Sequence, residues 1–113
     1  MDAGTNDMTG SELWALCKQK WGRSYDIRLV RRGKNMFVHV MWKFLEQQSF
    51  PLTPEEYEEQ LDAVSAYLNH WGCADLVRRE IMAAKKHPGY NVGGGASAVS
   101  IRLEGVTVGM GEF

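Results

Sequence analysis

The chain has 113 residues, of which 44% are hydrophobic, and a formal net charge of −1. A chain of roughly this length usually forms one domain with its own core. The near-neutral charge excludes a global basic field for binding phosphates, so nucleic-acid binding would need a local basic patch. No apolar run approaches the ~18 residues that span a bilayer, and we expect a soluble protein.

The organised part is predicted to be a single α+β domain over residues 9–105. Residues 1–8 (MDAGTNDM) are small and polar, and we expect them to form a disordered extension. Residues 106–113 offer little to pack against a core, and we expect them to form a flexible tail.

The first predicted element is a short amphipathic helix between Thr9 and Gly22. Thr9 and Glu12 have the T-x-x-E spacing of a capping box, in which each side chain satisfies the other residue's free backbone donor. Gly22 suits the left-handed end of the helix. The apolar residues that recur at helical spacing are Leu13, Trp14, Leu16, Cys17 and Trp21.

Residues 25–45 predict a β-hairpin, because apolar residues alternate along two runs around a glycine-containing turn at residues 32–35. The second strand is also apolar on its other face, at Phe37, Met41 and Leu45. Such a strand is either central and covered on both sides, or it exposes a face that meets a partner. The shared apolar face of the hairpin consists of Tyr25, Ile27, Leu29, Met36, Val38, Val40, Trp42 and Phe44.

A proline break separates the hairpin from an acidic helix that ends at Gly72. Pro51 cannot donate to a strand ladder, whereas Thr53, Pro54 and Glu56 form a helix start with a second T-x-x-E box. The glutamates of the first turns favour the positive end of the helix dipole. One stripe of this helix is apolar and consists of Tyr57, Leu61, Val64, Leu68 and Trp71.

A third helix is predicted from Cys73 to a terminator at residues 88–89. Lys85 and Lys86 are expected in its last turn, where positive charge suits the helix dipole, and His87 is expected to serve the same terminus.

A last strand is predicted after a flexible loop that contains Gly93–Gly95. Val99, Ile101 and Leu103 alternate with polar residues, as in a half-exposed strand. The element order is therefore α-β-β-α-α-β, which predicts a small three-stranded, mainly antiparallel sheet with helices packed on one face.

No catalytic or metal-binding pattern is visible in the chain. His39, His70 and His87 do not stand at HxxxH, HxH or HExxH spacing, and no nucleophile signature is present. The segment 89–97 lacks the lysine of a phosphate-binding loop and leads into a strand instead of a helix, so we interpret it as a mobile connection. We predict no enzymatic activity, no cofactor and no metal.

The two cysteines, Cys17 and Cys73, lie far apart and form no CxxC unit, which argues against a zinc knuckle or a thioredoxin-type site. We expect both to be small buried hydrophobes. A redox-linked thiol pair stays open as an alternative, and it requires Cα atoms within roughly 7 Å of each other.

Two surface features favour binding to another protein. The first is a basic edge on the hairpin at Arg28, Arg31 and Arg32, which could steer a charged partner. The second is the apolar patch that would be left if the helices do not cover Phe37, Met41 and Leu45.

The element order also matches the type II KH domain, which binds single-stranded RNA with a G-x-x-G loop between two helices. The corresponding junction here reads HWGCADL, with Gly72 and no second glycine three places on. A KH-like RNA-binding module therefore stays open as the alternative function.

Three segments resemble a domain-of-unknown-function family of cyanobacteria and of plant and algal chloroplasts: MTGSELWALCKQKWGRSYDIRL, FVHVMWKFLEQQSFPLTPEEYEEQLDAVSAYLNHWG and AVSIRLEG. The resemblance covers about residues 8–105. It implies an oxygenic phototroph, with the chloroplast stroma (transit peptide removed) or the cyanobacterial cytoplasm as the location. The family supplies no catalytic residues, and its distribution suggests, by association, an auxiliary factor in the assembly or regulation of a photosynthetic complex.

Overall fold

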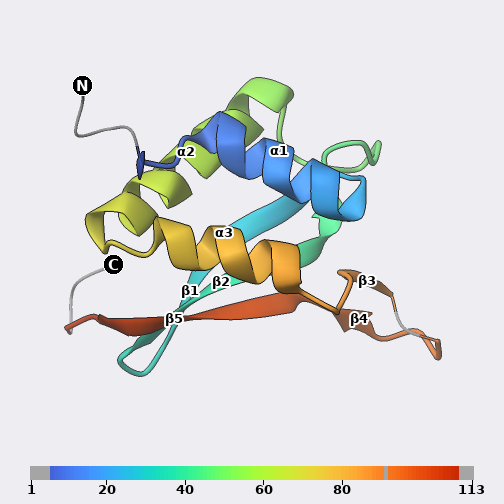
Figure 1. Ribbon diagram of the computed structural model, residues 1–113. Helices are drawn as coiled ribbons and strands as arrows, with labels where there is room; N and C mark the ends of the chain where they lie inside the picture. The colour runs from blue at the N-terminus through green and yellow to red at the C-terminus, as the bar shows by residue number, and fades with distance from the viewer. Residues whose placement is uncertain (1–5, 91, 110–113) are drawn as a thin grey trace.

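The protein folds into two layers, with three helices packed on one face of a three-stranded sheet (Figure 1). This computed structural model describes residues 6–90 and 92–109. The arrangement confirms the predicted α+β class and the placement of the helices on one face. The helices are α1 (Gly10–Trp21), α2 (Pro54–His70) and α3 (Ala74–Ala83).

The sheet is antiparallel throughout and has the order β1-β2-β5, so β2 is central. Two further strands, β3 and β4, pair with each other and add a small second sheet to the predicted order. The strands are β1 (Tyr25–Arg32), β2 (Asn35–Phe44), β3 (Gly89–Tyr90), β4 (Ala96–Ser97) and β5 (Val99–Thr107).

The two predicted capping boxes differ in the structure. At α2 both halves form: Thr53 Oγ1 accepts from the Glu56 N–H, and the Glu56 carboxylate accepts from the Thr53 N–H. At α1 only Thr9 caps, because the Glu12 carboxylate instead accepts from the Arg78 guanidinium at 2.6 and 2.9 Å. That ion pair joins α1 to α3.

The core lies between the sheet and the helices. Gly10 lets α1 approach α2 closely, since a Cβ there would stand 2.2 Å from Asp62 Oδ1. Tyr57 is fully buried, and its hydroxyl donates to the Tyr25 carbonyl at 2.8 Å, which ties α2 to β1. The largest buried aliphatic side chains are Leu13, Ile27, Met36, Leu61, Leu68, Ile81 and Leu103.

The packed part of the chain is wider than the predicted range 9–105. Met8 is buried at the start, and β5 continues to Thr107 with Val106 and Val108 buried at the end. The alternation of valine with small polar residues continues the strand pattern here, and the extended β5 runs along the hairpin. Residues 1–5 and 110–113 lie outside the described part of the chain.

The third helix is shorter than predicted. It ends at Ala83, with Ala84 in an extended conformation, so Lys85 and Lys86 follow the helix instead of forming its last turn. His87 packs edge-on against the Tyr25 ring at 5.9 Å and does not serve the helix end.

The helix ends early because the end of α1 holds this segment. The Lys20 ammonium donates to the Met82 carbonyl at 2.8 Å, and the Trp21 indole N–H donates to the Lys86 carbonyl at 3.1 Å. Both carbonyls are therefore satisfied without further helical turns.

The glycine-rich segment 89–97, interpreted from sequence as a mobile connection, contains the paired strands β3 and β4. Gly93 and Gly94 have φ angles of 104° and 99°, which only glycine adopts readily, and they form the turn between these strands. Across the described ranges, no helix is long and apolar enough to cross a membrane.

Candidate functional site

The face of the sheet opposite the helices is left uncovered by them (Figure 1). Side chains alternate along each strand, so residues between the buried ones point to this face. We call it the open face. Its members on β1, β2 and β5 are Arg28, Val30, Arg32, Phe37, His39, Met41, Lys43, Ser100, Arg102 and Glu104.

The centre of the open face is apolar and half-buried. Strand pairing sets Phe37 between Val30 on β1 and Arg102 on β5. The Phe37 and His39 rings lie 6.1 Å apart between centroids, in an edge-on arrangement. Met41 continues this row along β2 and is also half-buried. Phe37 and Met41 therefore lie together on the open face, as the alternation in the sequence predicts.

Leu45 does not join this row, which corrects the predicted apolar patch. β2 ends at Phe44, and the pairing of β1 with β2 is irregular beyond Ile27. The Leu45 N–H donates to the Ser24 carbonyl at 2.9 Å, and the Leu45 side chain packs against the core. Simple alternation cannot be extended past an irregular strand end.

The three arginines of the predicted basic edge do not all lie on the same face of the sheet. Arg28 and Arg32 are exposed on the open face, where Arg28 Nε lies 2.7 Å from Asp26 Oδ2. Arg31 faces the other way, and its guanidinium donates to the carbonyls of Gly33 and Gly109. Arg31 therefore secures the end of the hairpin.

Arg102, Val30 and His39 also belong to the open face, and the sequence reasoning did not select them. The alternation over residues 99–103 shows that Arg102 points away from the core. Its place beside Phe37 depends on the register between β2 and β5, which a single sequence does not specify.

His39 is the titratable group at the centre of the open face. Its partial burial, together with the positive charge of Arg32, lowers the pKa of the imidazole. The ring is therefore neutral at physiological pH, where it can contribute an aromatic surface next to Phe37 without adding charge.

The cysteines are both buried, and neither forms a disulfide. Burial raises the pKa of the Cys17 thiol to about 12 and also raises that of Cys73. The Cys17 thiol donates to the Arg23 carbonyl at 3.3 Å. A thiol with a raised pKa and no access to solvent is a poor nucleophile, so these surroundings suit structural cysteines better than redox-active ones.

No group of three or more His, Cys, Asp or Glu residues within the described ranges could hold a metal ion. The G-x-x-G loop that a KH domain requires between two helices is not present at the junction of α2 and α3. α2 and α3 are joined by a tight turn in which Gly72 has a φ of 68° and no second glycine follows it. The open face is therefore the surface that the geometry brings forward as a candidate site.

Comparison with known proteins identifies the family. Residues 11–112 match the family described as Domain of unknown function (DUF3067). No curated protein matches the chain. Among solved structures, the chain is similar to the solution NMR structure of the Alr2454 protein from Nostoc sp. strain PCC 7120, at 45% sequence identity with a TM-score of 0.77. The match covers 86% of this chain and 88% of that chain. This chain therefore belongs to the DUF3067 family.

Proposed function

We propose that this protein is a non-enzymatic auxiliary factor of cyanobacteria or chloroplasts that binds another protein on the open face of its sheet. The observation that carries the proposal is that Phe37 and Met41 of β2, together with Val30 of β1, form a half-buried apolar row on a face that the protein's own helices leave uncovered. Arginines stand around this row. An apolar centre with an arginine-containing polar rim is the usual anatomy of a protein interface.

The apolar row supplies the binding energy in this proposal. Covering a large apolar side chain contributes about 1.5–3 kcal/mol when the burial is complete. Phe37 and Met41 are half-buried in the free protein, so each contributes part of that amount. Because they lie on the central strand, a partner that covers them is surrounded by β1 and β5 on either side.

The rim defines the chemistry of the partner. Arg32 and Arg102 form no ion pair with a carboxylate of the described residues, whereas Arg28 is already paired with Asp26. A partner surface with an apolar side chain flanked by aspartate or glutamate fits this arrangement. The face can attract such a partner although the whole chain has a net charge of −1.

The setting in a phototroph, and a role in the assembly or regulation of a photosynthetic complex, are part of the same proposal. They are supported by association: by the resemblance to a family of cyanobacteria and chloroplasts and by the related protein of Nostoc. Partner identification is therefore the first experiment.

The experiment is affinity capture from cyanobacterial and chloroplast extracts with the tagged full chain and two variants. Phe37→Ser/Met41→Ser disrupts the open face. Met82→Ser removes an exposed methionine from α3, on the other side of the molecule, and serves as the matched control. We expect a protein that the wild type and M82S retain and that the double variant loses. The purified pair should then bind with at least a tenfold weaker Kd for the double variant.

Folding of each variant is checked by circular dichroism and urea unfolding, so that a loss of binding can be assigned to the surface. Equal capture by all three forms, or no partner in any extract, would contradict the proposal. If single-stranded RNA is retained instead, and nuclease treatment removes it, the alternative RNA-binding function replaces this one.

A further inference from the structure

The sheet has two outer edges, at β1 and at β5, and the two edges differ in whether side chains cover their outward backbone groups. On β1, the residues opposite β2 in hydrogen-bonded pairs alternate with residues whose N–H and C=O point outward. Ile27 is one of the outward residues, and its carbonyl already accepts from Gln60 Nε2 at 3.0 Å. Gln60 also donates to Asp26 Oδ1, so a side chain of α2 covers this edge at Ile27.

Among the described residues, no side chain is seen to bond to the outer edge of β5 in this way. The two-residue turn between Arg32 and Asn35 makes these residues a hydrogen-bonded pair. The backbone N–H and C=O groups of alternate β2 residues therefore point to β1, and those of the remaining residues point to β5. Val38 and Val40 are in the second group and pair with Ile101 and Val99. It follows that the backbone N–H and C=O of the intervening residues of β5 point away from the sheet.

The outward residues are Ser100 and Arg102, and no strand of the described chain pairs with this side of β5. Their backbone groups repeat about every 7 Å along the strand. This is the spacing that an added antiparallel or parallel strand requires.

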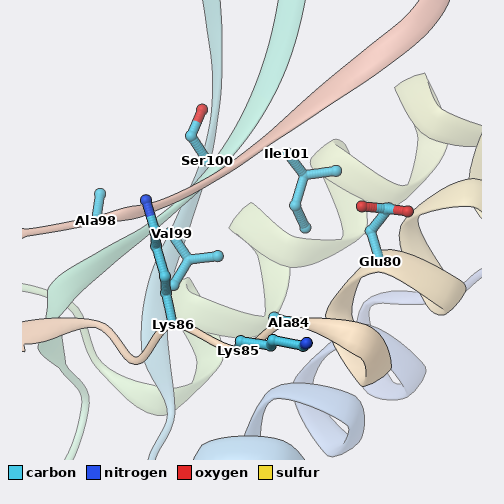
Figure 2. Close-up of a pocket in the computed structure, with 8 residues that line it drawn as sticks. All are labelled: Glu80, Ala84, Lys85, Lys86, Ala98, Val99, Ser100 and Ile101. Atoms are coloured by element: carbon cyan, nitrogen blue, oxygen red, sulfur yellow. The ribbon is translucent and has the colours of Figure 1, made fainter.

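A cleft of about 240 Å³ runs along this edge, between β5 and the segment that follows α3 (Figure 2). Its floor is apolar and includes Ala84, Val99 and Ile101. Two lysines, Lys85 and Lys86, stand on its wall, and the Lys86 side chain rises toward the strand near Ala98 (Figure 2).

The charge of the cleft is unbalanced. Lys85 and Lys86 are exposed, and neither forms an ion pair with a carboxylate of the described residues. Glu80 is the one acidic residue in the lining. The segment that carries the lysines is held in place, since the Lys86 carbonyl accepts from the Trp21 indole. The backbone that carries the two lysines is thus held beside an unpaired strand edge.

We propose that the β5 edge binds an extended acidic segment of a partner protein as an added strand. The backbone of the segment pairs with Ser100 and Arg102, and its aspartate or glutamate side chains point into the cleft toward Lys85 and Lys86. The apolar side chains that alternate with them point to the opposite face of the sheet, beside Arg102. The inference deepens the proposed function, because Arg102 also borders the open face, and one partner can use both surfaces.

The first test uses a synthetic eight-residue peptide of alternating glutamate and valine, titrated into the ¹⁵N-labelled full chain. A control peptide has two of the valines replaced by proline, which keeps the charge and prevents strand pairing. We expect saturable binding of the first peptide, with the largest amide shifts and slowed hydrogen exchange at Ser100 and Arg102. Binding should be at least tenfold weaker for the proline peptide.

The second test reverses the lysines. Lys85→Glu/Lys86→Glu should weaken peptide binding at least tenfold, whereas Lys34→Glu/Arg79→Glu, which makes the same change in net charge away from the cleft, should weaken it less than threefold. Equal weakening by both variants would overturn the inference. So would equal binding of the proline peptide, or displacement of the peptide by a single-stranded oligonucleotide at equal charge concentration, since either shows a general site for polyanions.

The two proposals fail separately in these experiments. If the captured partner binds the K85E/K86E variant normally but not the F37S/M41S variant, binding on the open face is supported and the proposed strand addition is wrong. If the glutamate–valine peptide binds at Ser100 and Arg102 while F37S/M41S captures the same proteins as wild type, strand addition at the β5 edge is supported and the proposed binding on the open face is wrong.

Discussion

Phe37 and Val38 are neighbours on the central strand, yet they meet opposite surroundings. Val38 is fully buried under the helices between Leu29 and Ile101, whereas Phe37 is half-buried on the open face between Val30 and Arg102. The helix-covered face stabilises the fold, and the open face gains little from apolar side chains unless something else covers them. The contrast predicts that substitutions on one face change stability and those on the other change binding.

The largest expected effect tests this contrast on β5. Ile101→Ala removes a buried side chain and should lower the free energy of unfolding by about 2–5 kcal/mol, as large-to-small core substitutions do. Arg102→Ala, one residue along on the open face, should change it by about 0.5 kcal/mol or less. Urea unfolding monitored by tryptophan fluorescence measures both. Similar losses at the two positions would show that the open face is also part of the stabilising core.

A smaller effect is expected for the ion pairs of two arginines, one in the helix layer and one on the open face of the sheet. Arg78 on α3 bridges Glu12 of α1 and Asp75, and its side chain is 23% exposed, whereas Arg28 on the open face is 60% exposed. Arg78→Met should cost about 1–2 kcal/mol, because it leaves the Glu12 carboxylate without its partner. Arg28→Met should cost less than about 1 kcal/mol, because Arg28 is exposed and the buried Asp26 carboxylate keeps its hydrogen bond from Gln60. Equal costs in urea unfolding would mean that the burial of the arginine does not decide the contribution of its ion pair.

The same pair predicts a pH dependence with a definite sign. The hydrogen bond from Arg78 lowers the pKa of Glu12 below its ordinary value of 4.5. Because the unfolded chain then binds the proton more tightly than the folded one, this contribution is present above about pH 4.5 and is lost as the pH falls through the lowered pKa. Unfolding free energies of wild type and R78M should therefore converge in acid. A constant difference across this range would contradict the linkage.

The sequence was sufficient for features set by local chemistry. The Thr53–Glu56 box, the period of the hairpin and the apolar stripe of α2 each follow from a few neighbouring residues, and the structure contains all three. Features set by distant contacts were missed. The Trp21 and Lys20 side chains hold the chain after α3, and Arg78 captures Glu12, so helix length and capping there depend on residues more than 60 positions away.

The candidate site shows the same division. Alternation in β2 places Phe37 and Met41 on one face, but the neighbours of Phe37 depend on strand register, and Leu45 turns back to the core beyond an irregular pairing. The β5 cleft was missed because Lys85 and Lys86 read as the last turn of a helix. Each omission comes from a contact between elements, for which one sequence carries no periodic signal.

The smallest expected effect lies at the centre of the open face. Partial burial and Arg32 lower the pKa of His39 from its ordinary 6.5, so the folded protein takes up the proton less readily than the unfolded chain. Stability from this group is therefore present above about pH 6.5 and is lost as the pH falls through the lowered pKa. His39→Gln should remove this part of the pH dependence while leaving stability at pH 8 nearly unchanged. An acidic partner should act in the opposite direction, since its carboxylates favour the imidazolium, and binding should strengthen as the pH falls from 8 to 6. An NMR titration of the His39 ring in the free and bound protein separates the two effects, and a pKa that does not rise on binding would place the acidic groups of the partner away from the open face.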